Sequence, residues 1–337
     1  MLARSAFVLL VLLLSATAGA QERHRLDRPL HDAVMRGTDL ILRQEYASAE
    51  STFADLRRRF PCHPAGYLYE AAVLQAQALD FGTFVPRPAF DSLLERGRDA
   101  CTALPDPEWT QYFLATADGY DAVARAERGD WLGGIRKGLA SASVFEDLVA
   151  ADSGFIDAYA GVGTYLYWRS RKTAFLRWLP FVADDRAEGI ALLERCAREG
   201  TYNRFAAVSS LVSLFLDREA YPDAETWSRI GLQTYPDNRV FLWGLATALD
   251  REHRSAEAVG AYRTLLASIL SSHSPNPYNE IVCRLNLARC AIASQQPDSV
   301  RPELTAVLRY EHFAFPDAYR SRAQQKFDDA RRLLESR

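Results

Sequence analysis

Residues 221–265 read YPDAETWSRIGLQTYPDNRVFLWGLATALDREHRSAEAVGAYRTL, and this stretch decides the fold. Within it, Ala224 and Ala258 stand 34 residues apart. The residues four and seven positions after each alanine continue the same helical face: Ser228, Gly231, Tyr262 and Leu265. Small residues at this spacing allow two helices to pack closely, and a period of 34 residues is typical of stacked helical hairpins. The stretch therefore predicts a chain of paired helices with an extended surface rather than a single deep pocket.

The same spacing continues on both sides of this stretch. An early unit has small residues at Gly37 and Ala49 and ends near Pro61. The positions of Gly37 and Ala49 correspond to Val212 and Ala224, then Ala246 and Ala258, then Ala288 and Val300 in later units. Pro236 ends the first of these units, and Tyr262 and Leu304 follow Ala258 and Val300 by four positions. Gly163 and Gly189 form a further pair of small residues, separated by an insertion. Apolar residues recur at spacings of three and four, and no strand pattern is present, so we expect an all-α chain.

These residues resemble the tetratricopeptide repeat family, in which a small residue at position 8 of each unit faces another at position 20. An aromatic residue follows at position 24, which is Phe53 in the early unit, and a proline near position 32 ends the unit. The resemblance covers most of the chain, although the tryptophan usual at position 4 is missing from most units. It implies a right-handed superhelical solenoid of helical hairpins over residues 28–314. Residues 315–337 read as an amphipathic helix that caps the exposed end of the stack.

Residues 1–20 have the composition of a secretory signal peptide. Arg4 precedes an apolar run, and a series of small residues ends at Ala20. The run is about half as long as the roughly 20 apolar residues that cross a bilayer. We therefore expect cleavage before Gln21, a short linker over residues 21–27 and no integral membrane segment in the mature chain. The expected location is the bacterial periplasm or the medium outside the cell.

Composition and motifs exclude several classes of function. The 337 residues are 48% hydrophobic and 25% charged, as in globular domains, and the formal net charge of −3 provides no basic field for nucleic acid. The six histidines have no metal-binding spacing, and no serine stands in a nucleophile motif. The sequence therefore predicts a non-catalytic protein without a cofactor or metal.

The five cysteines are too few and too scattered for a disulfide scaffold. Cys62 and Cys101 lie at the same end of a hairpin predicted over residues 66–80 and 89–103. An oxidising compartment would permit a disulfide between them if their α-carbons come within about 7 Å. Two unpaired thiols are the equal alternative.

One segment, residues 165–186, interrupts the repeat. Gly163 and Gly189 lie 26 positions apart where a regular hairpin needs about 12, and the extra residues fall at 169–186. The segment combines aromatic and basic residues, among them Trp168, Arg171, Lys172 and Arg177. In one hypothesis the aromatic residues pack against the stack and the arginines pair with Asp184, Asp185 and neighbouring acids. In a second, the basic residues bind an acidic or carboxylate-bearing ligand, and in a third the segment touches a membrane surface.

The resemblance also implies which residues line a concave groove. The candidate binding residues in the groove and at its rim are Asp157, Thr164, Tyr167, Asn203, Arg204, Ser209 and Trp243. The expected function is that of a scaffold in the bacterial envelope, holding a protein or peptide in this groove. A glycan or small-solute receptor, with tryptophans stacked on sugar rings, is the alternative. An enzyme with its site in the insertion is a third possibility.

Overall fold

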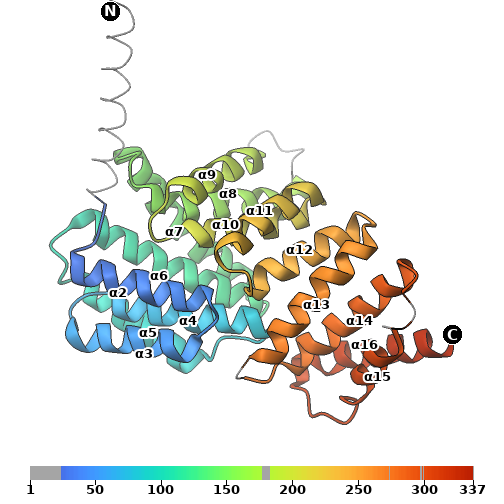
Figure 1. Ribbon diagram of the computed structural model, residues 1–337. Coiled ribbons are helices and arrows are strands. Elements are labelled where there is room, and N and C mark those ends of the chain that lie inside the picture. Colours follow the sequence, from blue (N-terminus) through green and yellow to red (C-terminus); the bar gives the residue numbers. More distant parts are fainter. Residues whose placement is uncertain (1–23, 177–182, 273, 297, 299, 337) are drawn as a thin grey trace, which may run out of the picture. The chain divides into compact units, whose positions relative to one another are not determined.

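Helices form every regular element in the part of the chain that the computed structural model describes, residues 24–176, 183–272, 274–296, 298 and 300–336 (Figure 1). The predicted all-α fold is confirmed. The predicted signal peptide and the first residues of the predicted linker lie outside these ranges. The chain divides into two compact units: unit 1 comprises Met1–Gln77 and Phe84–Ala207, and unit 2 comprises Ala78–Thr83 and Val208–Arg337.

Unit 1 contains the N-terminal helices. They are α2 (Arg28–Leu42), α3 (Tyr46–Arg59), most of α4 (Ala65–Phe81), α5 (Arg87–Cys101), α6 (Pro107–Glu127), α7 (Trp131–Ala151), α8 (Tyr159–Lys172), α9 (Arg186–Glu199) and the first turn of α10 (Arg204–Asp217). Two short 3₁₀ helices, η1 (Ile156–Ala158) and η2 (Ala174–Leu176), flank α8. Successive helices contact each other in the pairs α2–α3, α5–α6, α6–α7, α7–α8 and α8–α9, and the contacts of α6 with α7 and of α8 with α9 are the most extensive of these. Unit 1 is thus a stack of helical hairpins in chain order.

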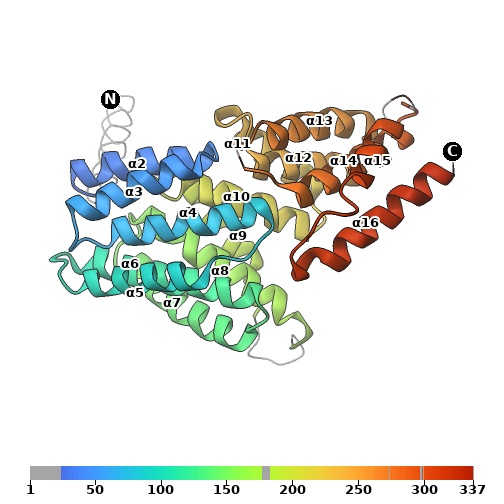
Figure 2. The same cartoon turned by 90° about the horizontal axis from the view of Figure 1, so that it is seen from below.

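Unit 2 contains the remaining helices in the same arrangement. After the rest of α10 they are α11 (Tyr221–Thr234), α12 (Arg239–Arg251), α13 (Ser255–Ser271), α14 (Pro277–Ala293), α15 (Val300–Leu308) and α16 (Asp317–Glu335). Figures 1 and 2 show α12, α13 and α14 side by side, and each contacts the next. The final helix, α16, buries Tyr319 and Phe327 in the same core as α12 to α15. Both units therefore have the helical solenoid architecture predicted from the repeat spacing.

Small residues mark the closest helix crossings, as the spacing predicts. A β-carbon on Gly163 would lie 2.5 Å from the carbonyl oxygen of Gly189, and one on Gly189 would lie 2.6 Å from the carbonyl oxygen of Gly163. In unit 2, Ala224 and Ala258 are fully buried. A β-carbon on Gly37 would meet the ring of Phe53 at 2.2 Å. Because only a hydrogen fits at these glycines, α8 and α9 approach backbone to backbone.

A buried ion pair joins two distant segments within unit 2. The side chains of Asp80, in the last turn of α4, and Arg239, at the start of α12, are 1% and 6% exposed. The Arg239 Nε donates to both carboxylate oxygens of Asp80, at 2.8 and 3.1 Å. The carbonyl oxygen of Asp80 accepts from the side-chain amides of Asn276, at 3.2 Å, and Asn279, at 2.5 Å. Residues 78–83 are therefore fixed by charge and hydrogen bonds to helices that follow much later in the chain.

The N-terminal segment that precedes α2 packs against unit 1. Leu26 is buried, and its N–H donates to the Tyr202 hydroxyl at 3.0 Å. His24 stacks on Phe155 with ring centroids 4.4 Å apart. The end of the predicted linker thus contributes to the core of unit 1.

Candidate functional site

The predicted groove residues belong to both units, and those of unit 1 include deeply buried side chains. Asp157 is 4% exposed, and its Oδ1 accepts from the N–H groups of Tyr202, at 2.9 Å, and Asn203, at 2.8 Å. Burial raises the pKa of Asp157 to about 6, although these N–H donors act in the opposite direction. Tyr167 is completely buried. Asp157 and Tyr167 therefore lie in the interior of unit 1 and are not accessible to a ligand.

Asn203 and Arg204, predicted at the groove rim, differ in exposure. The Asn203 side-chain amide donates to the Tyr112 hydroxyl, at 2.8 Å, and to the carbonyl oxygen of Asp157, at 2.9 Å. Arg204 is exposed, with its guanidinium 5.4 Å from the centroid of the Phe205 ring. Asn203 therefore fixes the turn before α10, and Arg204 faces solvent.

The other predicted groove residues are partly exposed. Thr164 lies on α8 of unit 1, whereas Ser209 and Trp243 belong to unit 2. The carbonyl oxygen of Ser209 accepts from the Ser213 hydroxyl at 3.1 Å. Trp243 packs against the core of unit 2, with its ring centroid 6.2 Å from that of Tyr262. The indole of Trp243 is thus partly covered by the core of unit 2, whereas a tryptophan that stacks on a sugar needs an open ring face.

The basic residues of the insertion fall into two groups. Arg169 pairs with Asp185, and the Arg186 Nε lies 2.7 Å from an Asp184 oxygen, as the packing hypothesis predicts. Arg171 and Lys172 are exposed at the end of α8, and Trp168 is partly exposed beside them. Arg177 and Trp178 lie outside the described residues.

The most exposed apolar surface of unit 1 lies on α7, in a set that the sequence analysis did not identify. Four large side chains face solvent along its first nine residues, with exposed fractions of 54%, 82%, 60% and 53%: Trp131, Leu132, Ile135 and Leu139. We call this set the α7 stripe. Phe175, just after α8, is 75% exposed. Contiguous exposed apolar residues of this kind mark interaction sites more often than isolated ones do.

The adjacent face of α7 is also apolar and packs against the rest of unit 1. Its buried residues are Gly134, Ser141, Ala142, Phe145 and Leu148. Asp130 caps the helix by accepting from the Gly133 N–H at 3.0 Å, so the helix begins directly at Trp131. A helix that is apolar on two faces is normally covered on both. The apolar residues of the run WLGGIRKGL at 131–139 indicate such a helix in the sequence.

Positive charge borders the α7 stripe. The ammonium nitrogen of Lys172 lies 5.1 Å from the ring centroid of Trp131 and 5.9 Å from that of Trp168. Arg136 is exposed on α7, next to Ile135. The neighbouring Lys137 is already paired, 2.8 Å from an Asp118 oxygen. The stripe therefore combines apolar contact area with at least two accessible cations.

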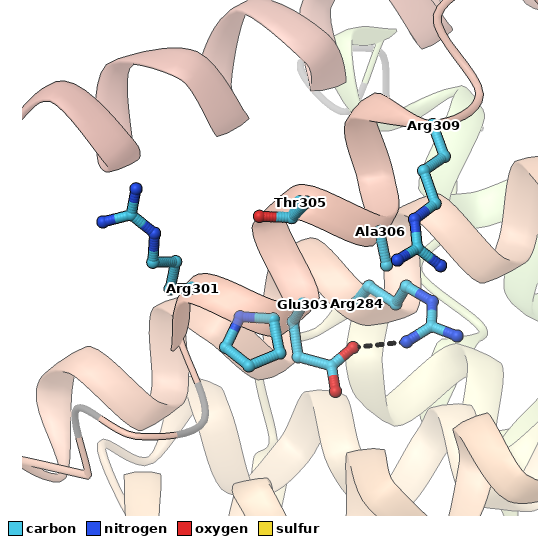
Figure 3. A pocket seen from close by; sticks show the side chains of 7 residues that line it. Arg284, Arg301, Glu303, Thr305, Ala306 and Arg309 are labelled. Atoms are coloured by element: carbon cyan, nitrogen blue, oxygen red, sulfur yellow. Dashed lines mark hydrogen bonds and ion pairs between the residues drawn. The ribbon is translucent and has the colours of Figure 1, made fainter.

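Unit 2 has a shallow, arginine-rich hollow of about 480 Å³ between α14 and α15 (Figure 3). Arg284 is balanced by two carboxylates, those of Glu280, at 2.8 Å, and Glu303, at 2.6 Å. Figure 3 shows the Arg301 guanidinium directed away from Arg284 and Arg309. Because these cations do not converge on one point, the hollow is a less suitable binding site than the α7 stripe.

Within the described ranges, no group of three or more histidine, cysteine, aspartate or glutamate side chains is arranged to hold a metal ion. No helix there is long and apolar enough to cross a membrane.

Cys62 and Cys101 are free thiols in this structure, Cys62 exposed and Cys101 buried. Burial raises the pKa of Cys101 to about 11, so its reactive thiolate is scarce near pH 8. We predict that Ellman's reagent modifies Cys62 rapidly in the folded protein and all five thiols after denaturation in urea. Cys62→Ser should abolish the rapid phase. Three reactive thiols after denaturation would instead indicate a disulfide.

No family model and no curated protein matches this chain. Among solved structures it is similar to the C-terminal part of a TPR repeat-containing protein from Cytophaga hutchinsonii, at 15% identity and a TM-score of 0.41, covering 87% of this chain and 98% of that one. It is also similar to a human IFIT1 dimer with m7Gppp-AAAA, at 12% identity and a TM-score of 0.34, covering 93% and 79%. A third similar structure is the P58(IPK) TPR domain, at 12% identity and a TM-score of 0.29, covering 91% and 99%.

Proposed function

We propose that this chain is a non-catalytic binding protein that holds a protein partner on the α7 stripe. The observation that carries this proposal is the exposure of Leu132, Ile135 and Leu139 on one face of a helix whose adjacent face is packed. Burying a leucine or isoleucine side chain contributes about 1.5–3 kcal/mol. A partner that covers the stripe would therefore gain several such contributions at one site.

The proposed binding surface differs from the concave groove expected from the sequence. Asp157 and Tyr167 are buried within unit 1, whereas the α7 stripe is open to solvent. Lys172 borders the stripe and was among the residues predicted to bind. Part of the predicted site thus contributes to the surface that we propose.

The alternatives have less support in the described residues. An enzyme site in the insertion needs available acids, but Asp184 and Asp185 pair with Arg186 and Arg169. A sugar site needs an open indole face, whereas Trp243 packs against the core of unit 2, and the Lys172 ammonium group lies 5.1 and 5.9 Å from the ring centroids of Trp131 and Trp168.

We further propose that the protein acts outside the cytoplasm. The support is the composition of residues 1–20, with one basic residue, a short apolar run and small residues at the end. Expression of the full-length chain with a tag at its C-terminus would test this location. A tagged product that begins at Gln21 is expected in the periplasmic or extracellular fraction.

The α7 stripe should be sensitive to a single charge. We predict that Ile135→Glu abolishes enrichment of binding peptides from a phage-displayed library, because a carboxylate in the middle of the stripe must be desolvated when a partner covers it. The change should alter the free energy of unfolding by no more than about 0.5 kcal/mol, since Ile135 is 60% exposed. Panning against both proteins, with urea unfolding monitored by circular dichroism, measures these effects.

Leu270→Glu provides the matched control, because Leu270 is 54% exposed on α13 in unit 2. This variant should enrich the same peptides as the wild type. Equal enrichment by the wild type and Ile135→Glu would place peptide binding elsewhere and refute the proposed role of the stripe.

A further inference from the structure

The spacing of the α7 stripe matches the contact surface of one helix against another. Leu132, Ile135 and Leu139 follow one another at intervals of three and four, so they form a continuous ridge about 10 Å long. Such a ridge packs between the side-chain rows of a second helix. A peptide in β conformation would need unpaired backbone groups on its partner, and the backbone of a helix interior such as that of α7 is already hydrogen-bonded. The ridge therefore fits a helical partner better than an extended one.

The charged side chains around the ridge indicate which charge a partner should carry. Lys172 and Arg136 are exposed and lie within 4 Å of no carboxylate among the described residues, although Arg136 attracts the Asp130 carboxylate at longer range. The acids that flank the start of α7 are already engaged, and the exposed Glu146 and Asp147 come only two turns after Leu139. Asp130 accepts from Gly133 and lies 3.0 Å from Arg125, and Asp118 lies 2.8 Å from both Arg98 and Lys137. The accessible charge beside the ridge is therefore positive and complements acidic side chains.

Two indole rings restrict the position of the Lys172 ammonium group. Trp131 and Trp168 lie 5.1 and 5.9 Å from it, within the range of cation–π attraction. A lysine that is already held loses less conformational freedom when it pairs with a carboxylate. Lys172 is thus a suitable anchor at the N-terminal end of the ridge, where Trp131 begins α7.

From these observations we infer that the α7 stripe binds an acidic amphipathic helix of a protein partner. The helix presents apolar side chains at intervals of three and four to Leu132, Ile135 and Leu139, and carboxylates beside them to Lys172 and Arg136. This inference rests on the proposed function and specifies the class of partner.

Two synthetic helical peptides of about 18 residues test the inference, because helices of this length are stable enough to compare. Both carry leucines at the same intervals of three and four; one carries glutamates beside them and the other carries lysines. Fluorescence polarisation with the full chain should show the glutamate peptide binding at least about tenfold more tightly, and the ratio should fall as salt is added. Ile135→Glu should abolish the binding of the glutamate peptide.

A charge reversal gives the sharpest control. Lys172→Glu combined with Arg136→Glu should reverse the preference in favour of the lysine peptide. Arg28→Glu combined with Arg36→Glu makes the same change in net charge at two exposed positions of α2 and should leave the preference unchanged.

The outcomes separate the inference from the proposed function. Equal binding of the two peptides, or binding of neither, would overturn the inference that the partner is an acidic helix. The proposed function would still hold if enrichment of phage-displayed peptides is lost in Ile135→Glu. Sedimentation with phosphatidylserine vesicles that is lost in Ile135→Glu would identify a membrane surface as the occupant and overturn the inference. Concentration-dependent self-association that is lost in the same variant would overturn it in favour of a second copy of this chain.

Discussion

Gly189→Ala should lower the free energy of unfolding by about 2–3 kcal/mol. The added β-carbon would lie 2.6 Å from the carbonyl oxygen of Gly163 and 3.0 Å from the backbone nitrogen of Tyr167. Both neighbours are backbone atoms, so α8 and α9 must move apart to relieve the overlap. This loss exceeds the roughly 1 kcal/mol that alanine gains over glycine within a helix. Urea unfolding monitored by circular dichroism measures the change.

Gly260→Ala is the matched control for this substitution. Gly260 lies within α13, and a β-carbon there would have no heavy atom within 4 Å. The same change should therefore stabilise the protein by about 0.5–1 kcal/mol through helix propensity alone. If Gly189→Ala shifted the unfolding midpoint in the same direction as Gly260→Ala, the close backbone crossing of α8 and α9 would be refuted.

Arg239→Met should destabilise unit 2 by about 3–5 kcal/mol, because it leaves the Asp80 carboxylate buried without its counter-charge. The Asp80 side chain is 1% exposed, so water cannot replace the guanidinium without opening the core. Combining Arg239→Met with Asp80→Leu should recover much of the loss, since no buried charge then remains. Unfolding free energies of the two single variants and the double variant form a double-mutant cycle that measures the coupling.

An exposed pair provides the comparison for that cycle. Arg58 and Asp55 lie 3.2 Å apart on α3, with side chains 71% and 49% exposed. Arg58→Met should change the free energy of unfolding by less than about 1 kcal/mol, because solvent screens this pair. Similar losses in Arg239→Met and Arg58→Met would contradict the structural role assigned to the buried pair.

The sequence predicted those features that depend on local spacing. The crossing of Gly163 and Gly189 was predictable because each helix pair needs small residues at fixed positions, whatever lies between them. The burial of Asp157 was not predictable in this way. The family pattern assigns its position to an open groove, but here the turn at Tyr202 and Asn203 lies directly on its carboxylate.

Contacts between residues far apart in the sequence could not be predicted from residue spacing. Asp80 and Arg239 are 159 positions apart, and each reads in the sequence as an ordinary surface charge. The α7 stripe was missed for a different reason. Its apolar residues resemble core residues in sequence, and only the structure, in which the adjacent face around Phe145 and Leu148 is buried and Leu132 and Ile135 are exposed, distinguishes the two sets.

The end of α4 has a consequence for how this protein can be divided. Residues 78–83 belong with residues 208–337, although more than a hundred residues separate them in the gene. A single cut in the gene therefore cannot yield the complete second unit, because a fragment that starts at Val208 lacks the carboxylate partner of Arg239. During synthesis, Asp80 leaves the ribosome long before that arginine exists, so this part of the core can close only late in translation.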